Sequence, residues 1–337
     1  MQILSNVSLL PYNTFHIDVL GKHFVEITSI DEFRELQQSQ AFQQNEKLIL
    51  GGGSNILFTK NFDGLVVKNS IKGIELVHED NHFFYVKANA GEVWHEFVLW
   101  CIERGYAGVE NLSLIPGQIG ASPMQNIGAY GVEIKDVCES VEAVHIHTSE
   151  LLTFSNSDCK FGYRESIFKH ELKNQVVITS VTYKLRKIPQ FHVDYGDIKN
   201  TLGEMMVSEL SLKAVSDAVI KIRSSKLPDP NVLGNAGSFF KNPVVTKEKT
   251  EELLAKNPVM PNYPQADGVK IPAGWLIEQC GWKGKIVGNT GSHKSQALVL
   301  VNYGGATGNE VYQLALDIQR SVLEKFGIEI NPEVNLV

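Results

Sequence analysis

The chain has 337 residues, more than one compact core usually contains, so two or three packed units are expected. Hydrophobic residues make up 43% and charged residues 20%, a balance that argues against a disordered chain. The net charge of −7 disfavours a dedicated nucleic-acid binder, although a local cluster of positive charge and backbone N–H groups still allows a small anionic ligand.

The first 200 residues are predicted to be rich in strands. Four short apolar runs have the composition of strands: 47–50, 56–58, 65–67 and 83–88. From Val177 to Leu185, apolar and polar residues alternate, which predicts a half-buried strand. We find no internal repeat and no low-complexity segment.

Three helices are predicted from apolar residues at helical spacing. The first covers residues 92–104, and its buried face is predicted to comprise Val93, Phe97, Trp100 and Cys101. The second starts near Ser211 and ends before the two prolines in residues 226–230. The third begins with a capping box at Thr307 and ends at Gly327. The pattern indicates an α+β protein whose strand-rich first part is followed, after a connecting region at 187–210, by a separate α/β unit.

The cysteines and histidines point to no metal site. Cys101, Cys138, Cys159 and Cys280 form no CxxC motif and are interpreted as reduced, mostly buried thiols. His145 and His147 alternate along an apparent strand and would share a face, but they are not expected to be metal ligands. No signal peptide or membrane-spanning segment is recognised, so a cytoplasmic location without membrane contact is expected.

The first candidate binding feature is a glycine turn after the strand at 47–50. It consists of Gly51, Gly52, Gly53, Ser54 and Asn55. Glycines let backbone N–H groups approach an anion closely, so the turn is a candidate phosphate cradle. It matches neither the Rossmann fingerprint nor a Walker A loop, and a turn without a ligand stays open as the alternative.

The second feature is the segment 116–131, here called the glycine-rich loop. It contains four glycines and few side chains large enough to fill a core. Small residues would let the backbone approach a flat aromatic ligand, whereas an Ω-loop without a ligand is the alternative. Taken singly, Arg164, Ser238 and Glu333 would be read as a solvated arginine, a residue in a packed turn and an exposed carboxylate.

In chain order, these segments resemble the family of UDP-N-acetylenolpyruvoylglucosamine reductases over almost the whole chain, from about Pro11 to the C-terminus. Ten motifs carry the resemblance: YNTF at 12–15, GGGSN at 51–55, IPGQIGASPMQNIGAYG at 115–131, FGYRES at 161–166, SKLPDP at 225–230, GNAGSFFKNP at 234–243, PNYPQADG at 261–268, GWLIEQCGWKG at 274–284, HKSQALVLVN at 293–302 and NPEV at 331–334. The number and order of the motifs, rather than any single one, identify the family.

The resemblance implies an α+β fold with an FAD-binding region of the vanillyl-alcohol oxidase type and a C-terminal α/β substrate-binding domain. The implied boundaries are residues 1–70 and 71–210 for the two FAD-binding subdomains and 211–328 for the substrate-binding domain, with a tail at about 329–337 that returns to the first subdomain. The family uses FAD and NADPH, and a monomer without nucleic-acid or membrane partners is expected.

The resemblance also assigns binding residues. FAD would be held by Gly51–Asn55 and by Pro116, Gly117, Gly120, Ser122, Asn126, Ile127, Gly128 and Arg223. The UDP-sugar or NADPH would contact Tyr130, Tyr195, Lys226, Asn242, Tyr263 and Gln296. Residues 193–197 resemble the loop of the type I enzymes, whose tyrosine folds over the substrate, so Tyr195 is expected to be a lid residue.

The implied reaction is the NADPH-dependent reduction of UDP-N-acetylglucosamine enolpyruvate to UDP-N-acetylmuramate, a step of peptidoglycan precursor synthesis. Arg164 would stabilise the negative charge that develops on the substrate, and Glu333 would polarise it in its protonated form. Ser238 would protonate the adjacent carbon as general acid. Many relatives have arginine two residues after the glutamate, and this chain has Asn335 there.

Two other functions remain as alternatives. The first is another flavin oxidoreductase on the same fold that acts on a hydroxy acid or an alcohol, although no histidine-centred motif for such a reaction is apparent. The second is a nucleotide-sugar binder without activity. A bound yellow chromophore would separate the binder from the enzymes, and oxidation of NADPH that depends on the enolpyruvyl sugar would separate the two enzymes.

Overall fold

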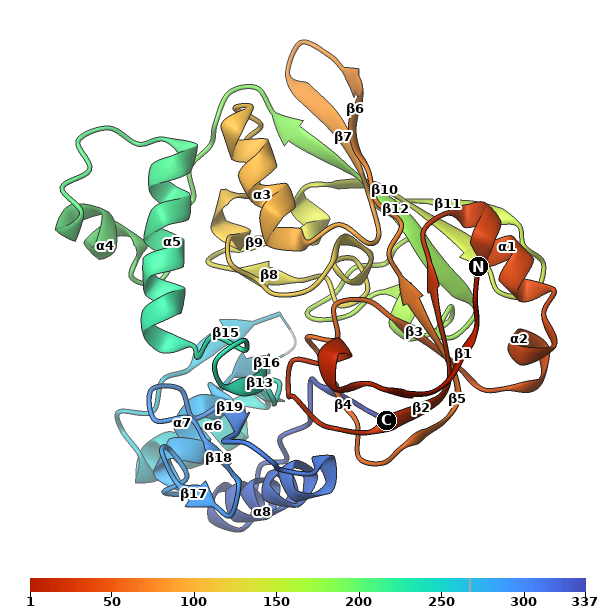
Figure 1. Cartoon of the computed structure of the whole chain (residues 1–337). Coiled ribbons are helices and arrows are strands. Elements are labelled where there is room, and N and C mark those ends of the chain that lie inside the picture. Colours follow the sequence, from red (N-terminus) through yellow and green to blue (C-terminus); the bar gives the residue numbers. More distant parts are fainter. Residues whose placement is uncertain (267) are drawn as a thin grey trace. The chain divides into compact units, whose positions relative to one another are not determined.

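The computed structural model describes residues 1–266 and 268–337, so Asp267 of the PNYPQADG motif lies outside the described residues. The chain divides into two compact units (Figure 1). Unit 1 comprises residues 1–7, 21–52 and 63–225, and unit 2 comprises residues 8–20, 53–62 and 226–337. The division into three domains stays a prediction.

Unit 1 contains two main sheets. The first has the order β1 (Leu4–Ser8), β2 (Leu20–Ile27), β5 (Phe62–Asn69), β3 (Lys47–Leu50). The second is antiparallel, in the order β11 (Leu151–Ser155), β10 (Cys138–His145), β12 (Val176–Arg186), β7 (Phe83–Asn89), β6 (Ile74–Glu79). The strands predicted at 47–50, 65–67 and 83–88 are confirmed in β3, β5 and β7.

The other elements of unit 1 are helices and short segments. The helices are α1 (Ile30–Gln37), α2 (Gln40–Gln44), α3 (Trp94–Glu103), α4 (Ile198–Glu204) and α5 (Leu212–Lys226). A small hairpin pairs β8 (Gly128–Ala129) with β9 (Val132–Glu133). The 3₁₀ segments are η2 (Glu110–Leu112), η3 (Ile119–Ala121), η4 (Ile134–Asp136) and η5 (Ile167–Lys169).

Strand β12 is more buried than its alternating sequence predicts. Residues 177–181 are buried on both faces of the sheet. Ile178 and Val181 belong to a core that includes α3, whereas Val177 packs into a second core with Val25 and Ile27 of the first sheet. The prediction of a half-buried strand was therefore wrong for this half of β12, because two cores meet there.

Two helical predictions in unit 1 need correction. Helix α3 starts at Trp94, so Val93 is its N-cap and Trp94 and Val98 join Phe97 on the buried face. Residues 187–210, interpreted as a connection, contain α4. This short helix is stabilised by tertiary packing, since Ile198 and other apolar residues contact α5 in one cluster.

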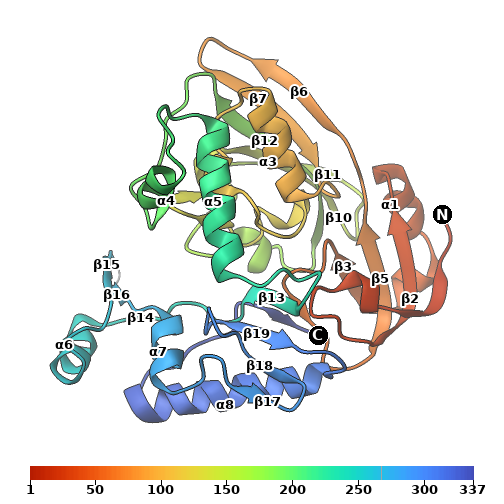
Figure 2. The same ribbon diagram turned by 60° about the vertical axis from the view of Figure 1, so that its left-hand side comes forward.

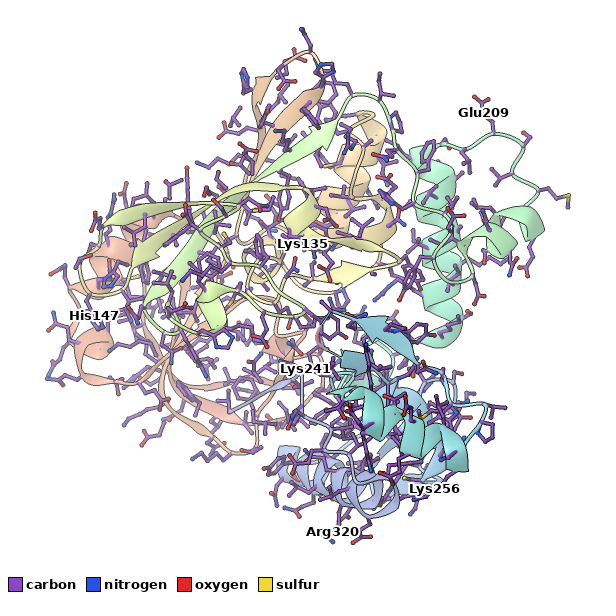
Figure 3. The ribbon with its side chains drawn as sticks, turned by 180° about the vertical axis from the view of Figure 1, so that it is seen from behind. Lys135, His147, Glu209, Lys241, Lys256 and Arg320 are labelled. Carbon is purple, nitrogen blue, oxygen red and sulfur yellow. The ribbon has the colours of Figure 1, made fainter. Side chains whose placement is uncertain are left out.

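Strand β10 ends at His145, so the predicted alternation of His145 and His147 along one strand was wrong. The ring atom Nδ1 of His145 accepts the backbone N–H groups of His147 and Thr148 at 3.3 and 3.2 Å. His147 therefore lies in the turn after the strand (Figure 3). His145 stabilises this turn, since its ring accepts backbone donors that the turn leaves unpaired.

In the residues that the structure describes, unit 2 is built on small sheets and three helices. The main sheet has the order β13 (Gly234–Ser238), β19 (Val299–Asn302), β18 (Thr290–Ser292), β17 (Ile286–Val287). Smaller ones are β14 (Val244–Val245), β16 (Gly268–Lys270), β15 (Tyr263–Gln265), and the parallel pair of β4 (Ile56–Leu57) with β20 (Asn335–Leu336). The helices are α6 (Lys247–Lys256), α7 (Ala273–Gln279) and α8 (Gly308–Phe326), and a 3₁₀ segment, η1, covers Leu10–Tyr12.

Helix α8 confirms its prediction in detail. Thr307 and Glu310 form a capping box, and Gly327 ends the helix with a φ of 63°. Its buried stripe packs against β18, β19 and α7 (Figure 2). Among the helices of residues 1–266 and 268–337, none is long and apolar enough to cross a membrane.

Candidate active site

The glycine turn after β3 is shaped by close backbone contacts. Gly53 has a φ of 63°, and a Cβ atom there would lie 2.0 Å from the carbonyl oxygen of Tyr12, so only glycine fits. A Cβ atom on Gly52 would lie 3.2 Å from Cα of Gly117, at the start of the glycine-rich loop. Gly52 is exposed, so its backbone is accessible to a ligand.

Lys68 of β5 is a candidate binding residue that the sequence analysis missed. It pairs with Leu50, the last residue of β3, and its Nζ donates to Oε1 of Gln118 at 3.3 Å. Burial lowers the pKa of the Lys68 amine, so a nearby anion would stabilise its charged form. The available signal was a single lysine directly after the apolar run 65–67.

The glycines of the glycine-rich loop have protein neighbours. A Cβ atom on Gly120 would lie 2.8 Å from Cβ of Ala90, and one on Gly128 would lie 2.7 Å from Cγ of Glu133. Pro116 is exposed, whereas Ile127 belongs to the core of unit 1. Packing alone therefore requires some of these small residues, and the composition of the loop does not by itself prove a ligand.

Ser122 and Asn126 hold the loop from inside unit 1. The hydroxyl groups of Ser122 and Tyr183, both buried, share a hydrogen bond of 2.7 Å. The buried amide of Asn126 makes three hydrogen bonds: Nδ2 donates to Oε2 of Glu133 (3.0 Å) and to the carbonyl oxygen of Gly162 (2.9 Å), and Oδ1 accepts from the N–H of Lys135 (2.9 Å). Both side chains are engaged with the protein, and their predicted contact with a cofactor stays a prediction.

Several residues around the loop hold a left-handed backbone without being glycine. They are Leu114 (φ 58°), Asn126 (44°), Tyr130 (50°) and Arg164 (58°). Such a conformation costs about 1 kcal/mol or more per residue, and it persists only where the surroundings fix it. Strain of this kind clusters at functional sites, which supports the choice of this region as the candidate site.

Arg164 lies beside the glycine-rich loop. Its Nη2 donates to the carbonyl oxygen of Gly128 at 2.9 Å, and its Nη1 lies 3.5 Å from that of Asn126. Lys169 donates to the carbonyl oxygen of Arg164 at 2.9 Å. The guanidinium group therefore both supports the loop and places a positive charge beside it.

Arg223 and His95 fix Leu114, two residues before the loop. The backbone N–H of Leu114 donates to Nδ1 of His95 at 3.0 Å, and its carbonyl oxygen accepts from Nε of Arg223 at 3.2 Å. Burial lowers the pKa of His95, and the charge of Arg223 adds to this shift. A neutral imidazole is the form that accepts the N–H of Leu114. His95 was missed because its partner lies 19 residues away.

In unit 2, the structure brings Ser238 and Glu333 to adjacent segments. The N–H of Glu333 donates to the carbonyl oxygen of Phe239 at 2.8 Å, and Phe240 forms a bridge with Pro332. Ser238 is exposed at the end of β13, beyond a bulge against β19. Backbone pairing therefore places the segments of Ser238 and Glu333 side by side.

The C-terminal tail contacts the glycine turn within unit 2. The backbone N–H and the Nδ2 group of Asn335 both donate to the carbonyl oxygen of Asn55, at 3.1 and 2.9 Å. Asn55 in turn donates from Nδ2 to the carbonyl oxygen of Glu333 at 3.3 Å. At the position where many relatives have arginine, this chain thus makes a neutral contact. Ser54, between the glycines and Asn55, is partly buried.

Four further predicted residues line unit 2 without forming one cluster. Oδ1 of Asn242 accepts the N–H of Ala273 at 2.9 Å, and Gln296 approaches the next residue of α7, since a Cβ atom on Gly274 would lie 3.1 Å from its Oε1. Tyr263 is exposed on β15, and Lys226 is exposed at the end of α5. Asn242 and Gln296 therefore both lie against the start of α7, whereas the other two present accessible side chains.

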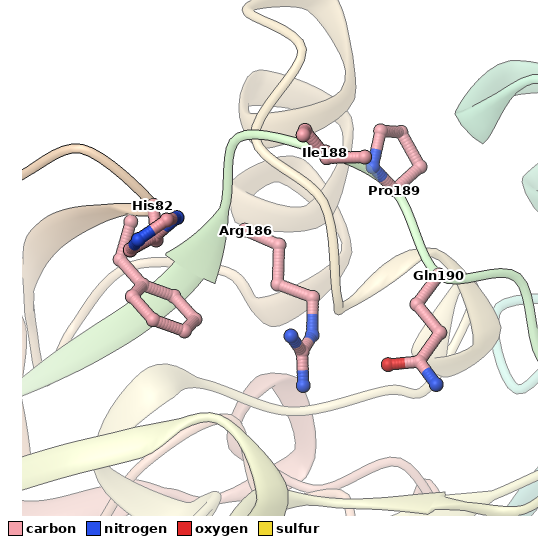
Figure 4. A pocket seen from close by; sticks show the side chains of 6 residues that line it. His82, Arg186, Ile188, Pro189 and Gln190 are labelled. Carbon is pink, nitrogen blue, oxygen red and sulfur yellow. The ribbon is translucent and has the colours of Figure 1, made fainter.

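A shallow hollow on unit 1 involves none of the predicted site residues. Its volume is about 360 Å³, and it is lined by His82, Phe83, Arg186, Ile188, Pro189 and Gln190 (Figure 4). The guanidinium carbon of Arg186 lies 5.6 Å from the ring centroid of Phe83. The hollow supports no alternative active site, because it gathers no group with acid, base or nucleophilic character apart from His82.

Two family models match the chain. Residues 229–337 match the C-terminal domain of UDP-N-acetylenolpyruvoylglucosamine reductase, and residues 22–155 match an FAD binding domain. A solved UDP-N-acetylenolpyruvylglucosamine reductase from Thermus caldophilus superimposes with a TM-score of 0.67 at 21% identity, covering 99% of this chain and 98% of that one. The expected fold, with an FAD-binding region followed by a C-terminal domain, is confirmed.

Curated relatives are similar over their full length. A protein from Flavobacterium johnsoniae is 52% identical and one from Amoebophilus asiaticus is 49% identical, each over 100% of both chains. One from Pseudomonas syringae is 49% identical over 100% of this chain and 99% of its own. All three are named UDP-N-acetylenolpyruvoylglucosamine reductase.

Proposed function

The chain belongs to the family of UDP-N-acetylenolpyruvoylglucosamine reductases, and from this we propose that it reduces UDP-N-acetylglucosamine enolpyruvate to UDP-N-acetylmuramate with NADPH and FAD. Full-length identity of 52% to a reductase of that name is the observation that supports the proposal most strongly. The protein would act as a cytoplasmic monomer in peptidoglycan precursor synthesis.

The residues of unit 1 fit FAD. The exposed backbone of Gly52 and the partly buried amine of Lys68 offer the N–H donors and the positive charge that a diphosphate requires. The glycine-rich loop and Arg223 would support the flavin side of the site. Bound FAD would supply hydride transfer from NADPH to the sugar substrate.

Arg164 and Glu333 would stabilise charge on the substrate. Hydride addition at the terminal vinyl carbon leaves negative charge that extends to the carboxylate of the enolpyruvyl group. The Arg164 guanidinium group, whose position is fixed by its contact with Gly128, would bind that carboxylate through its planar donors. Glu333, in its protonated form, would donate a hydrogen bond to the same developing charge.

Ser238 would complete the reaction as general acid. Its hydroxyl group would give a proton to the ether-bearing carbon, so that one hydride and one proton are added across the double bond. Serine is a weak acid, so its hydroxyl group must recover a proton after the transfer. Ser238 is exposed at the end of β13, so water can supply that proton. Tyr195, Tyr263, Lys226, Asn242 and Gln296 would bind the UDP-sugar or NADPH.

The proposal is tested by incubating the purified protein with NADPH and UDP-N-acetylglucosamine enolpyruvate in D₂O. We expect UDP-N-acetylmuramate that contains one deuterium, at the ether-bearing carbon, and an unlabelled hydrogen from NADPH at the terminal carbon. NADPH oxidation that proceeds equally well without the sugar would contradict the proposal. Oxidation of hydroxy acids or alcohols would favour the alternative flavin enzyme.

A further inference from the structure

Two Tyr-Gly dipeptides of unit 1 fit against each other. Tyr130 and Gly131 form the two-residue turn between β8 and β9, with φ of 50° and 84°, as a hairpin turn with two left-handed residues requires. Tyr195 and Gly196 lie in residues 193–197, here called the lid segment. A Cβ atom on Gly131 would lie 3.5 Å from Cβ of Tyr195, and one on Gly196 would lie 3.7 Å from Cδ1 of Tyr130. Each glycine thus faces the tyrosine of the other dipeptide.

A single buried amide joins the two segments behind these dipeptides. Nδ2 of Asn111 donates one hydrogen to the carbonyl oxygen of Tyr130 at 3.0 Å and the other to that of His192 at 2.7 Å. Asn111 is 1% exposed. His192 directly precedes the lid segment, so both hydrogen bonds act where the loop and the lid meet.

The backbone segment that carries Asn111 is itself held in place by hydrogen bonds. Asn111 lies in η2, followed by Ser113, whose hydroxyl donates to the carbonyl oxygen of Glu110 at 2.7 Å. The same hydroxyl lies 2.7 Å from that of Ser216 on α5, and both are buried. The amide therefore projects from a fixed support rather than from a mobile loop.

Apolar packing adds a second support for the lid segment. Val193 and Tyr130 pack against a cluster that includes Ile198 of α4 and Val219 of α5. The side chain of Tyr195, in contrast, stays 57% exposed. The segment is thus anchored at its start while its tyrosine ring remains accessible to a ligand.

We propose that Asn111 is a positioning residue that docks the lid segment on Tyr130, so that Tyr195 is held in place for substrate in advance. The substrate role of Tyr195 rests on the proposed function, whereas the docking contact does not. Holding the lid in advance removes part of the ordering cost of binding, so it should affect substrate affinity more than the chemical step.

The test compares FAD-bound Asn111→Asp with a matched control, Asn156→Asp. Nδ2 of Asn156 also donates to two carbonyl oxygens, those of Lys135 and Cys138 at 2.8 and 2.7 Å, but neither belongs to the lid. In Asn111→Asp we expect amide hydrogen exchange of 193–197 to be about tenfold faster and KM for the enolpyruvyl sugar to rise about tenfold, with kcat within about twofold. Asn156→Asp should leave both values unchanged, and exchange in α3 should not change in either variant.

Asn111→Ser keeps the test conclusive if the aspartate variant does not fold. Its hydroxyl can donate only one hydrogen, so we expect a smaller change in the same direction. Unchanged exchange of 193–197 together with unchanged KM would overturn the proposal, as would exchange that rises equally throughout unit 1. A wild-type protein that fails to reduce the sugar would overturn the proposed function, while the exchange difference would still test the docking contact.

Discussion

The two units position their candidate residues in different ways. In unit 1, left-handed backbone falls on Leu114, Asn126, Tyr130 and Arg164, and side chains such as His95 and Asn111 fix it through hydrogen bonds to the backbone. In unit 2, the residue before Ser238 is Gly237, which adopts the left-handed conformation without strain. The backbone of Glu333 is held by strand-like pairing with Phe239.

This difference determines whether a substitution changes stability together with function or changes the reaction alone. A strained non-glycine residue depends on the contacts around it, so a substitution near the glycine-rich loop should change stability and function together. Ser238 is exposed at the end of β13, so replacement of its side chain should change the reaction and leave stability almost intact. The following predictions test this contrast, from the largest expected effect to the smallest.

Ser238→Ala should slow re-oxidation of the reduced flavin by the enolpyruvyl sugar by about 10³-fold, because the proton donor is lost. Flavin reduction by NADPH should stay nearly normal, and the free energy of unfolding should change by less than about 0.5 kcal/mol, since the side chain is exposed. Stopped-flow absorbance and urea unfolding measure the two quantities. Loss of the first half-reaction would remove Ser238 from the role of proton donor.

Arg164→Ala should slow the same second half-reaction by about 10²-fold, and it should also lower stability, because Gly128 loses its hydrogen-bond donor. Arg104→Ala is a suitable control, since that guanidinium group covers the ring of Trp100 on the surface at 4.0 Å. An unchanged rate in Arg164→Ala would exclude this arginine from the site. A large effect of the control variant would show that lost charge in general, rather than position, is responsible.

Asn126→Ala should lower the free energy of unfolding by about 2 kcal/mol, because three hydrogen bonds are lost and alanine must hold a φ of 44°. Asn126→Gly should recover about 1 kcal/mol of this loss through relief of strain. Thermal unfolding and the amount of retained FAD provide the measurements. Equal stability of the alanine and glycine variants would show that backbone strain does not contribute.

Tyr195→Phe should weaken binding of the enolpyruvyl sugar by about fivefold, the value of one lost hydrogen bond. A titration of flavin absorbance measures the dissociation constant. Stability should not change, because the tyrosine side chain is 57% exposed. If the dissociation constant is unaltered, the hydroxyl group does not contact the substrate.

The smallest effect concerns the pH dependence of stability. Burial lowers the pKa of His95, so the unfolded chain binds a proton below about pH 6.5 that the folded chain does not bind. Stability is therefore complete above this pH and declines as the pH falls through it. His95→Asn keeps an acceptor for the N–H of Leu114 and should remove this part of the decline. Urea midpoints at pH 7.5 and 5.5 that differ equally in both proteins would contradict the assignment.

Local sequence signals predicted the elements that depend on local chemistry. The caps and apolar stripe of α8 and the strand β3 were read correctly, because neighbouring residues determine them. The ordered motifs also identified the family. In contrast, α4 and the double-sided burial of β12 depend on distant packing partners, and the sequence analysis described both incorrectly.

In the candidate site, too, residues that act through partners distant in sequence were not predicted. Motifs named Arg164 and the glycine-rich loop, and the structure brings them together. Asn111, His95 and Lys68 were missed, because each acts through a partner remote in sequence; Asn111 and His192 are 81 residues apart. The residues that hold a strained loop cannot be identified from the sequence pattern, because only the fold shows which backbone groups need hydrogen-bond partners.

The central claim is that one protein couples NADPH and the enolpyruvyl sugar through a bound flavin, and anaerobic stopped-flow absorbance tests it most directly. We predict that NADPH bleaches the flavin of the purified protein and that UDP-N-acetylglucosamine enolpyruvate then restores its colour. Bleaching without recovery would mean that the flavin passes its electrons to another substrate, and a colourless protein that takes up no FAD would contradict the account as a whole.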